Sequence, residues 1–252
     1  MTELVPMKAQ TYKDPRPPES FARFHRRART REPDLVYELV RVPTSLFCWV
    51  VFRARAISVG NVPATGPVIV APNHFSYADH FFVASFLRRR VRFMAKSQLF
   101  KGFAAWIYSH GGVFPVRRGH RDEEAFLTAR TILANGSAIT MYPEGGRSRT
   151  GALAERARPG IGRLALESGA TVVPVAIHGS ARVRNWRRLD IPRVTVRYGA
   201  PMRWSVVAAP TREQQQAVAD EVFAQIRSLY EELHRVGRHE VIRRDRAAAA
   251  GS

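Results

Sequence analysis

The sequence predicts an α/β protein in which helices cover a mostly parallel β-sheet, preceded by an N-terminal helical segment that contacts a membrane. Short β-rich runs alternate with segments of helical composition through most of the 252 residues, which is typical of a parallel sheet. Asn135-Gly136 and Ser168-Gly169 each follow a helical segment and suit its end. A hydrophobic content of 45% is enough for one sizeable core.

The N-terminal region is predicted to differ from the rest. Residues 1–33 contain several prolines and a run of arginines, and we expect a basic, extended or mobile arm. Residues 34–57 have helical composition, but Pro43 predicts two pieces, because proline disfavours helix in the residue before it. The apolar run 46–52 is much shorter than the roughly 20 residues that span a bilayer. We therefore expect this segment to lie in the membrane interface, with the arginines that follow at the headgroups.

The alternating elements begin after residue 58. The runs that predict strands are 68–71, 91–95, 112–116, 138–142, 171–177 and 194–198, and those that predict helices are 81–87, 98–108, 123–133 and 160–167. From Thr211 a long helix is expected, because its apolar residues repeat at helical spacing. The basic and alanine-rich tail, 237–252, is expected to fray.

Candidate catalytic residues follow the first predicted strand, 68–71. His74 and Asp79 are five residues apart, and an imidazole with a carboxylate nearby is a minimal general base. If a helix begins after His74, five positions are about 1.4 turns, so both groups lie loosely on the same side. Asp79 would also suit the N-cap of the helix at 81–87, and the two roles are compatible. No Gly-x-Ser-x-Gly elbow and no nearby cysteine is present, so we expect the reacting hydroxyl to belong to the substrate.

Basic side chains at other strand ends predict a phosphate site. Arg117 and Arg147 each follow a glycine-containing loop at the end of an apolar run, where a side chain can project over the ends of the strands. Arginine meets a phosphate with a planar fork of donors and stays protonated. Lys96 is a third candidate by the same argument, and Arg118 is a less specific one.

Glu144 is expected to serve the site without binding the phosphate, because its carboxylate would repel the anion. Two roles remain open for it, which are pinning an arginine and accepting a hydrogen bond from a substrate hydroxyl.

Four sequence blocks follow one another along the chain, at 73–79, 111–119, 142–149 and 172–177. Together they resemble the glycerolphosphate and lysophosphatidate acyltransferase family, over about residues 55–200. The resemblance implies transfer of a fatty acyl group from a thioester of coenzyme A or acyl carrier protein to a hydroxyl of a glycerol phosphate. We expect residues 58–236, including the long C-terminal helix, to form the acyltransferase domain.

Position by position, residues of all four blocks match the family. His74 becomes the general base and Asp79 its orienting partner. The residues that match the later blocks are Gly111, Arg117, Glu144, Gly145, Arg147, Ser148 and Pro174. The third block departs from the family pattern at two positions, with Tyr142 in place of phenylalanine and Gly146 in place of threonine. Neither departure removes a charged group assigned to the chemistry.

The interpretation that follows is acylation of the free hydroxyl of 1-acyl-glycerol-3-phosphate to give phosphatidate, with His74 as the base. The four blocks do not separate this acceptor from sn-glycerol-3-phosphate or another polar lipid head group. A catalytically idle protein that binds anionic lipid or nucleic acid is the alternative from a different class. Intact His74 and Asp79 count against it.

Composition limits which partners and cofactors we expect for this protein. The net charge of +19, from 40 Lys and Arg against 21 Asp and Glu, suits polyanions such as anionic membrane lipids, acidic acyl carrier protein, coenzyme A and nucleic acid. Nucleic acid is disfavoured, because no zinc-finger, RNA-recognition or helix-turn-helix signature accompanies the basic arm. A single cysteine, Cys48, excludes an internal disulfide and a multi-cysteine metal site. No Walker loop or dinucleotide fingerprint is present, so we expect no cofactor or metal besides the acyl donor as co-substrate.

The sequence also predicts a location. Two further segments, 81–90 and 99–108, place aromatic residues beside cations, which suits a layer of lipid headgroups and equally suits core helices ending in solvated charge. The N-terminus lacks the apolar stretch of a secretory signal. We therefore expect a peripheral or monotopic protein at the cytoplasmic face of the cell membrane, with no transmembrane span.

Overall fold

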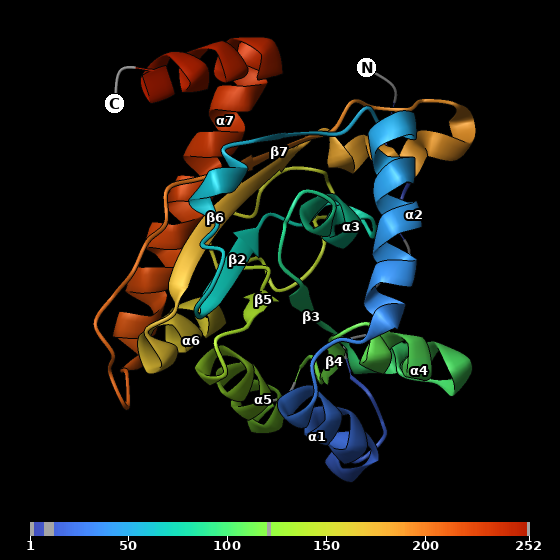
Figure 1. Cartoon of the computed structure of the whole chain (residues 1–252), viewed down its shortest axis with the longest axis vertical. Helices are drawn as coiled ribbons and strands as arrows, with labels where there is room; N and C mark the ends of the chain where they lie inside the picture. The colour runs from blue at the N-terminus through green and yellow to red at the C-terminus, as the bar shows by residue number, and fades with distance from the viewer. Residues whose placement is uncertain (1–2, 8–12, 120–121, 251–252) are drawn as a thin grey trace.

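In the computed structural model, which describes residues 3–7, 13–119 and 122–250, a seven-stranded sheet has helices on both faces (Figure 1). The strands are β1 Arg55–Ile57, β2 Val68–Pro72, β3 Val91–Lys96, β4 Val113–Val116, β5 Ala138–Thr140, β6 Thr171–His178 and β7 Thr195–Tyr198. Their order is β1-β7-β6-β2-β5-β3-β4, and only β7 against β6 is antiparallel. The predicted α/β class with a mostly parallel sheet is confirmed.

Helices follow most of the strands. The α-helices are α1 Ala22–Thr30, α2 Leu35–Val51, α3 Asp79–Ala84, α4 Gly102–His110, α5 Glu123–Ala134, α6 Gly160–Ser168 and α7 Arg212–Ala250. Short 3₁₀ helices are η1 Pro18–Phe21, η2 Val59–Asn61, η3 Ser97–Leu99 and η4 Ser180–Arg188. Because parallel strands need such crossovers, their carboxyl ends, and the loops that leave them, gather at one edge of the sheet.

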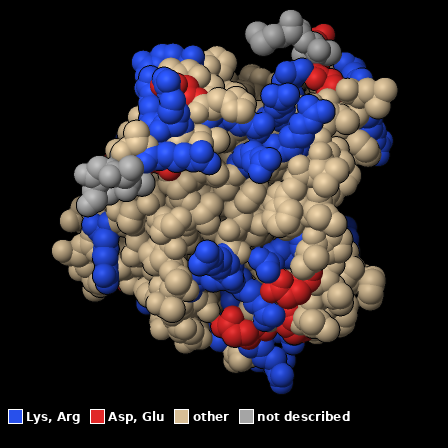
Figure 2. Space-filling view, turned by 45° about the horizontal axis from the view of Figure 1, so that its top comes forward, with Lys and Arg blue, Asp and Glu red and all other residues tan. Residues whose placement is uncertain are grey.

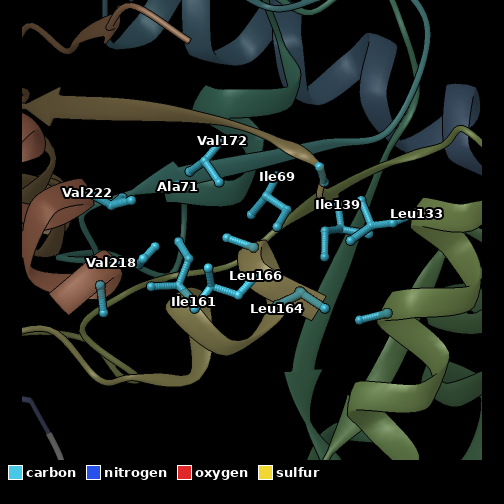
Figure 3. Packing of buried hydrophobic residues seen from close by; sticks show 14 of the residues in the cluster. Ile69, Ala71, Leu133, Ile139, Ile161, Leu164, Leu166, Val172, Val218 and Val222 are labelled. Atoms are coloured by element: carbon cyan, nitrogen blue, oxygen red, sulfur yellow. The ribbon is translucent and has the colours of Figure 1, made fainter. Parts of the chain in front are cut away.

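The central strand β2 contributes side chains to the hydrophobic cores on both faces of the sheet. All five of its residues are buried, as expected for a strand covered on both sides. Ile69 and Ala71 point into the core under α5, α6 and α7 (Figure 3), whereas Val68 and Val70 point into the core under α2 and α3. Side chains of a strand alternate between faces, so β2 ties both cores together and holds the loop after it in place.

The N-terminal region is more ordered than the sequence suggested. Residues 18–30 were expected in an extended arm, but they form η1 and α1. The reason is a pair of buried aromatic side chains, Phe21 and Phe24, which pack against Phe100 and Ala105. Burial of these apolar side chains offsets the conformational entropy that is lost when the segment becomes ordered. The many arginines of the segment had suggested an arm without such buried contacts.

The break predicted at Pro43 is also wrong, because α2 is one helix that contains Pro43. Its N-cap is Asp34, whose carboxylate accepts a hydrogen bond from the backbone N–H of Val36 at 3.1 Å. After the proline, the Thr44 hydroxyl donates to the carbonyl of Val40 at 2.6 Å. Pro43 is exposed, so water can reach the carbonyl that it leaves unpaired.

Two further segments, residues 55–57 and the C-terminal tail, differ from what the sequence predicted. Residues 55–57 were expected in the helical segment, yet they form β1, which pairs with β7. Three residues are too few for a recognisable strand pattern. At the C-terminus, the tail expected to fray continues α7 beyond a kink at Gly237, whose φ of 73° is not helical. Val241 in this last part is fully buried with Ile57 and Leu233, which fixes it on the sheet.

Within the residues that the structure describes, none of the helices combines the length and apolar character needed to cross a membrane.

Candidate active site

The loop that carries His74 leaves the carboxyl end of β2 and is fastened to the neighbouring strand β6. Asn73 fastens it with its side chain, whose oxygen accepts from the N–H of Ile177 at 2.6 Å and whose amide donates to the Ile177 carbonyl at 3.2 Å. The asparagine is fully buried. An amide side chain thus continues the sheet pairing for one more position, which places His74 directly beyond the strand end.

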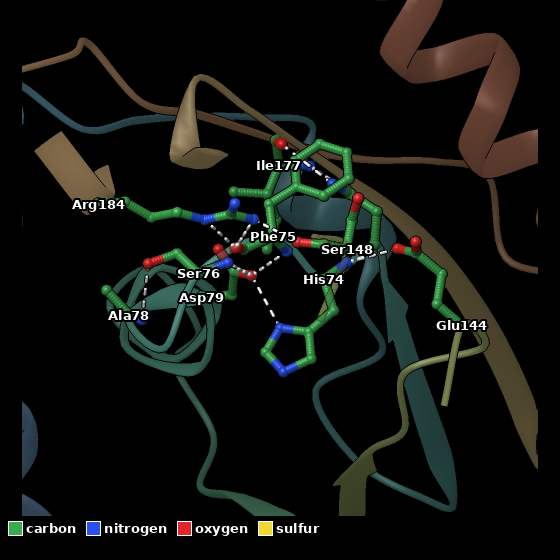
Figure 4. Close-up of polar contacts among 10 residues, drawn as sticks. His74, Phe75, Ser76, Ala78, Asp79, Glu144, Ser148, Ile177 and Arg184 are labelled. Atoms are coloured by element: carbon green, nitrogen blue, oxygen red, sulfur yellow. Dashed lines mark hydrogen bonds and ion pairs between the residues drawn. The ribbon is translucent and has the colours of Figure 1, made fainter. Parts of the chain in front are cut away.

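Asp79, the first residue of α3, organises the loop around the histidine. Its Oδ2 atom accepts three hydrogen bonds, from Nδ1 of His74 at 2.8 Å and from the backbone N–H groups of Phe75 and Ser76 at 2.7 Å each (Figure 4). The carboxylate is fully buried. One oxygen atom therefore bonds the imidazole and also satisfies two N–H groups of the loop ahead of α3. The N-cap role expected for Asp79 is wrong, because Asp79 is the first residue of the helix and the N-cap is Ala78, which makes no side-chain cap.

The ring of His74 is prepared to accept a proton. Because Nδ1 donates to Asp79, Nε2 is the nitrogen left with a lone pair, and in Figure 4 it points away from the loop. Burial lowers the pKa of His74, as do the charges of Arg118 and Arg147, while Asp79 opposes them. The imidazole is therefore neutral near pH 7, which is the state that a general base requires.

Tyr142 supports the ring from one side. The two ring centroids are 3.9 Å apart and the planes are inclined by 21°, so the rings are stacked. Where the family pattern has phenylalanine, the tyrosine keeps this contact and adds a hydroxyl. That hydroxyl is buried and finds no hydrogen-bond partner among the described residues.

Glu144 binds the backbone of the loop. Its Oε1 accepts from the N–H of His74 at 2.6 Å and its Oε2 accepts from the N–H of Ala154 at 3.2 Å. The predicted role of pinning an arginine is not seen, since both oxygens are taken by backbone donors and no ion pair of Glu144 occurs in the described parts of the chain. Burial raises the pKa of this carboxyl to about 7, although the two N–H donors oppose the rise.

Three cationic side chains from different strand ends lie close together, and two of them lie near His74. Arg118 and Arg147 both lower the pKa of His74 and also that of Lys96, where burial is the largest cause. Such mutual effects arise only between charges that lie close together. Two of the four predicted phosphate ligands, Arg118 and Arg147, thus lie near the histidine, and Lys96 lies near both arginines.

Arg117, the fourth, has a different setting. Its backbone N–H donates to Asp122 Oδ2 at 2.6 Å, and its side-chain Nε is buried without a hydrogen-bond partner in the described chain. No influence of Arg117 on the pKa of His74 or Lys96 is seen among the groups described. The sequence favoured Arg117 over Arg118, whereas Arg118 is the one of the two whose charge acts on the histidine.

The loop of the third block lies against the histidine loop. The N–H of Ser148 donates to the carbonyl of His74 at 2.8 Å, and the Ser148 hydroxyl accepts from the N–H of Gly151. Gly145 has a φ of 70°, and a Cβ there would lie 3.0 Å from the side chain of Arg158. The glycine is therefore required by the turn. A polar cavity of about 390 Å³ opens within this loop, and Arg147 and Glu144 are among the residues that line it.

Sequence reasoning missed Arg184 of η4, which ties two loops of the site together. Its guanidinium donates to the carbonyl of Phe75 at 2.9 Å and to that of Ser148 (Figure 4). It also donates to the carbonyl of Arg149 at 2.8 Å. Arg184 lies outside the four sequence blocks, in a segment with several other arginines, so no local signal distinguishes it. Asn73 precedes His74 in the first block, but its role was also missed. Its hydrogen bonds to Ile177 exist because β6 neighbours β2 in the sheet, and the sequence does not give this strand order.

Comparisons with known proteins identify acyltransferases as similar to this chain. The Acyltransferase family model matches residues 55–178, from β1 to the end of β6. Two curated relatives are 24% identical over 149 residues, 1-acyl-sn-glycerol-3-phosphate acyltransferase LPAT1, chloroplastic, from Arabidopsis thaliana and the BAT2 enzyme of the same description from Brassica napus. The match covers 58% of this chain but 41% and 43% of theirs, so the chain spans about two-fifths of their length.

A solved structure shows the same fold. The crystal structure of PlsC, a 1-acyl-sn-glycerophosphate acyltransferase from Thermotoga maritima, has a TM-score of 0.60 against this chain at 21% sequence identity. The correspondence covers 85% of this chain and 88% of that one. It therefore includes most of the sheet and its surrounding helices.

Proposed function

This chain belongs to the acyltransferase family, and from that premise we propose that it transfers a fatty acyl group from a thioester donor to the free hydroxyl of 1-acyl-glycerol-3-phosphate, giving phosphatidate. The observation that carries the proposal is the 2.8 Å contact between His74 and Asp79 beside three converging cations. A base and an anion site are what acylation of a phosphate-bearing alcohol needs.

In the proposed reaction, the acceptor hydroxyl gives its proton to Nε2 of His74 while its oxygen attacks the thioester carbonyl carbon. Asp79 stabilises the imidazolium that forms. The tetrahedral intermediate then loses the thiolate as the C–S bond breaks, and His74 returns the proton to the sulfur. The products are the new ester and a free thiol, and no acyl-enzyme is required. Backbone N–H groups near the site are expected to stabilise the oxyanion.

The phosphate of the acceptor is assigned to Lys96, Arg118 and Arg147. A phosphate monoester carries nearly two negative charges, so it would relieve the mutual repulsion of these three cations. The donor is proposed to be acyl-coenzyme A or acyl carrier protein, and both are anionic partners suited to a chain of net charge +19.

We also propose that the protein meets its lipid substrate at an anionic membrane surface. The exposed face of α2 carries Leu39, Val42, Leu46 and Val50, and α4 adds Phe103, which is 73% exposed. The two helices lie next to each other on one side of the molecule (Figure 1). Apolar side chains exposed together on neighbouring helices suit contact with the lipid interface.

The test is thiol release from palmitoyl-coenzyme A, with lysophosphatidate or glycerol-3-phosphate as the acceptor. Lysophosphatidate-dependent release is expected, and His74→Ala should lower kcat by about 100-fold or more, the scale of a lost general base. His110→Ala, which removes a histidine of α4, serves as the matched control and should leave kcat unchanged. An undiminished rate in folded His74→Ala would refute the mechanism. Release with glycerol-3-phosphate alone would refute the proposed acceptor.

A further inference from the structure

A group of arginines lies around the turn between α2 and β1 and includes none of the residues of the candidate active site. Its members come from three separate parts of the chain and are Arg53, Arg55, Arg193 and Arg238. Arg238, just after the kink of α7, donates a hydrogen bond to the carbonyl of Arg53 at 3.0 Å. Burial and the charges of the other three lower the pKa of Arg238. None of the four forms an ion pair with a carboxylate in the described residues, so the group has uncompensated positive charge.

A cavity of about 540 Å³ lies beside this group, between β1 and the end of α7. Arg55, Arg238 and Arg246 line it. The acidic side chain in its lining is Asp245, which accepts a hydrogen bond from the Ser58 hydroxyl at 2.7 Å. Three arginines against one carboxylate make the cavity attractive to an anion. Figure 2, which brings the top of Figure 1 forward, shows Lys and Arg gathered in its upper part, with few acidic residues.

An apolar cavity adjoins the cationic one. It measures about 410 Å³ and is lined by Trp49, Phe86, Ala54 and the two residues that it shares with its neighbour, Arg55 and Ala56. The rings of Trp49 and Phe86 have their centroids 6.1 Å apart. Trp49 belongs to the C-terminal part of α2. A positively charged hollow and an aromatic hollow therefore meet at Arg55.

We propose that these two cavities bind one anionic phospholipid of the membrane, with its phosphate in the arginine cavity and the start of its acyl chains against Trp49 and Phe86. Guanidinium groups suit phosphate, and aromatic rings suit the level of the headgroups. A soluble polyanion, such as an acidic protein or a nucleic acid, would gain nothing from the apolar cavity. The site contains none of the residues assigned to acyl transfer. It rests on the membrane contact proposed above, but not on the reaction.

The test measures binding to vesicles of phosphatidylcholine, with and without phosphatidylglycerol, by co-sedimentation. Phosphatidylglycerol is neither acceptor nor product of the proposed reaction, so catalytic-site binding does not interfere. A basic side chain near an anionic membrane contributes about fivefold in affinity. Arg55→Gln/Arg238→Gln should therefore weaken binding to the anionic vesicles by about 25-fold and leave binding to neutral vesicles unchanged.

The matched control is Arg130→Gln/Arg212→Gln, which removes the same charge from α5 and from the start of α7. Equal weakening by both variants would mean that net charge alone attracts the protein, and the site would be refuted. Unchanged vesicle binding of Arg55→Gln/Arg238→Gln would also refute the site. A loss of binding to acyl carrier protein in this variant, with vesicle binding kept, would refute it as well. Should the first variant not fold, Arg55→Gln/Arg246→Gln, at two exposed positions, makes the same test. Vesicle binding is independent of thiol release, so a failure here leaves the acyl transfer proposal separately testable.

Discussion

One carboxylate oxygen of Asp79 holds the imidazole of His74 and the two N–H groups that follow it. Asp79→Asn keeps the shape of the side chain but loses the charge that stabilises an imidazolium. The expected result is a fall in kcat of about 100-fold or more, with little change in KM, measured by thiol release. Asp34→Asn, which alters the N-cap carboxylate of α2, is the control for stability and should keep kcat. Equal rates for Asp79→Asn and the unchanged protein would contradict the assigned role.

The Glu144 carboxyl predicts a dependence of stability on pH. Its pKa is raised from the ordinary 4.5 to about 7, so the folded chain binds the proton more tightly than the unfolded chain does. The resulting stabilisation is full below pH 4.5 and is lost as the pH rises through 7. Between pH 5 and pH 8 the protein should therefore lose about 2–3 kcal/mol of unfolding free energy relative to Glu144→Gln.

Urea unfolding of both proteins at several pH values measures this difference. The comparison matters more than either curve, because other carboxylates and histidines titrate in both proteins. Two parallel curves would contradict the raised pKa and show that the backbone donors on Glu144 fully offset its burial.

At the scale of elements, the close approach of α6 to α7 depends on Gly162. A Cβ at this position would lie 1.8 Å from the backbone oxygen of Gln215 in α7. Gly162→Ala must push the helices apart, and we expect it to lower the unfolding free energy by about 3 kcal/mol. Gly60→Ala, where a Cβ meets nothing within 4 Å, is the matched control and should change little. Urea unfolding of the two variants decides, and similar midpoints would contradict the packing described.

The end of α7 shows a second effect at this scale. Its last part turns at Gly237 and buries Val241 beside β1. This contact brings Arg238 to the turn that follows α2, so two regions that the sequence separates widely share one cationic surface.

The distribution of apolar residues over the whole molecule predicts how it binds membranes. Leu39 and Val50 of α2 are 64% and 69% exposed. Leu39→Gln/Val50→Gln should lower binding to neutral phosphatidylcholine vesicles by about tenfold or more, because burial of such a side chain contributes about 1.5–3 kcal/mol. Leu127→Gln/Val206→Gln changes two exposed apolar residues elsewhere and should leave binding unaltered. Equal losses in the two variants would contradict a membrane face on α2.

The sequence by itself determined the fold class and predicted the two residues that we propose as the base. Alternating apolar runs predict a covered parallel sheet because side-chain periodicity is a local property. His74 and Asp79 are equally local, since five residues at a strand end can reach each other without help from the rest of the chain. The main strands were expected within a few residues of their bounds, whereas β1 was missed because three residues carry too little pattern.

Tertiary structure decided the rest, since it depends on residues that are far apart in sequence. The basic composition of the N-terminal arm did not predict its helices. They form because Phe21 and Phe24 are buried beside Phe100. Arg118 reaches the surroundings of His74 through the order of the strands, and Arg184 reaches the same loops from η4. Strand order and helix packing bring distant side chains together through burial and pairing, which the local sequence pattern does not encode.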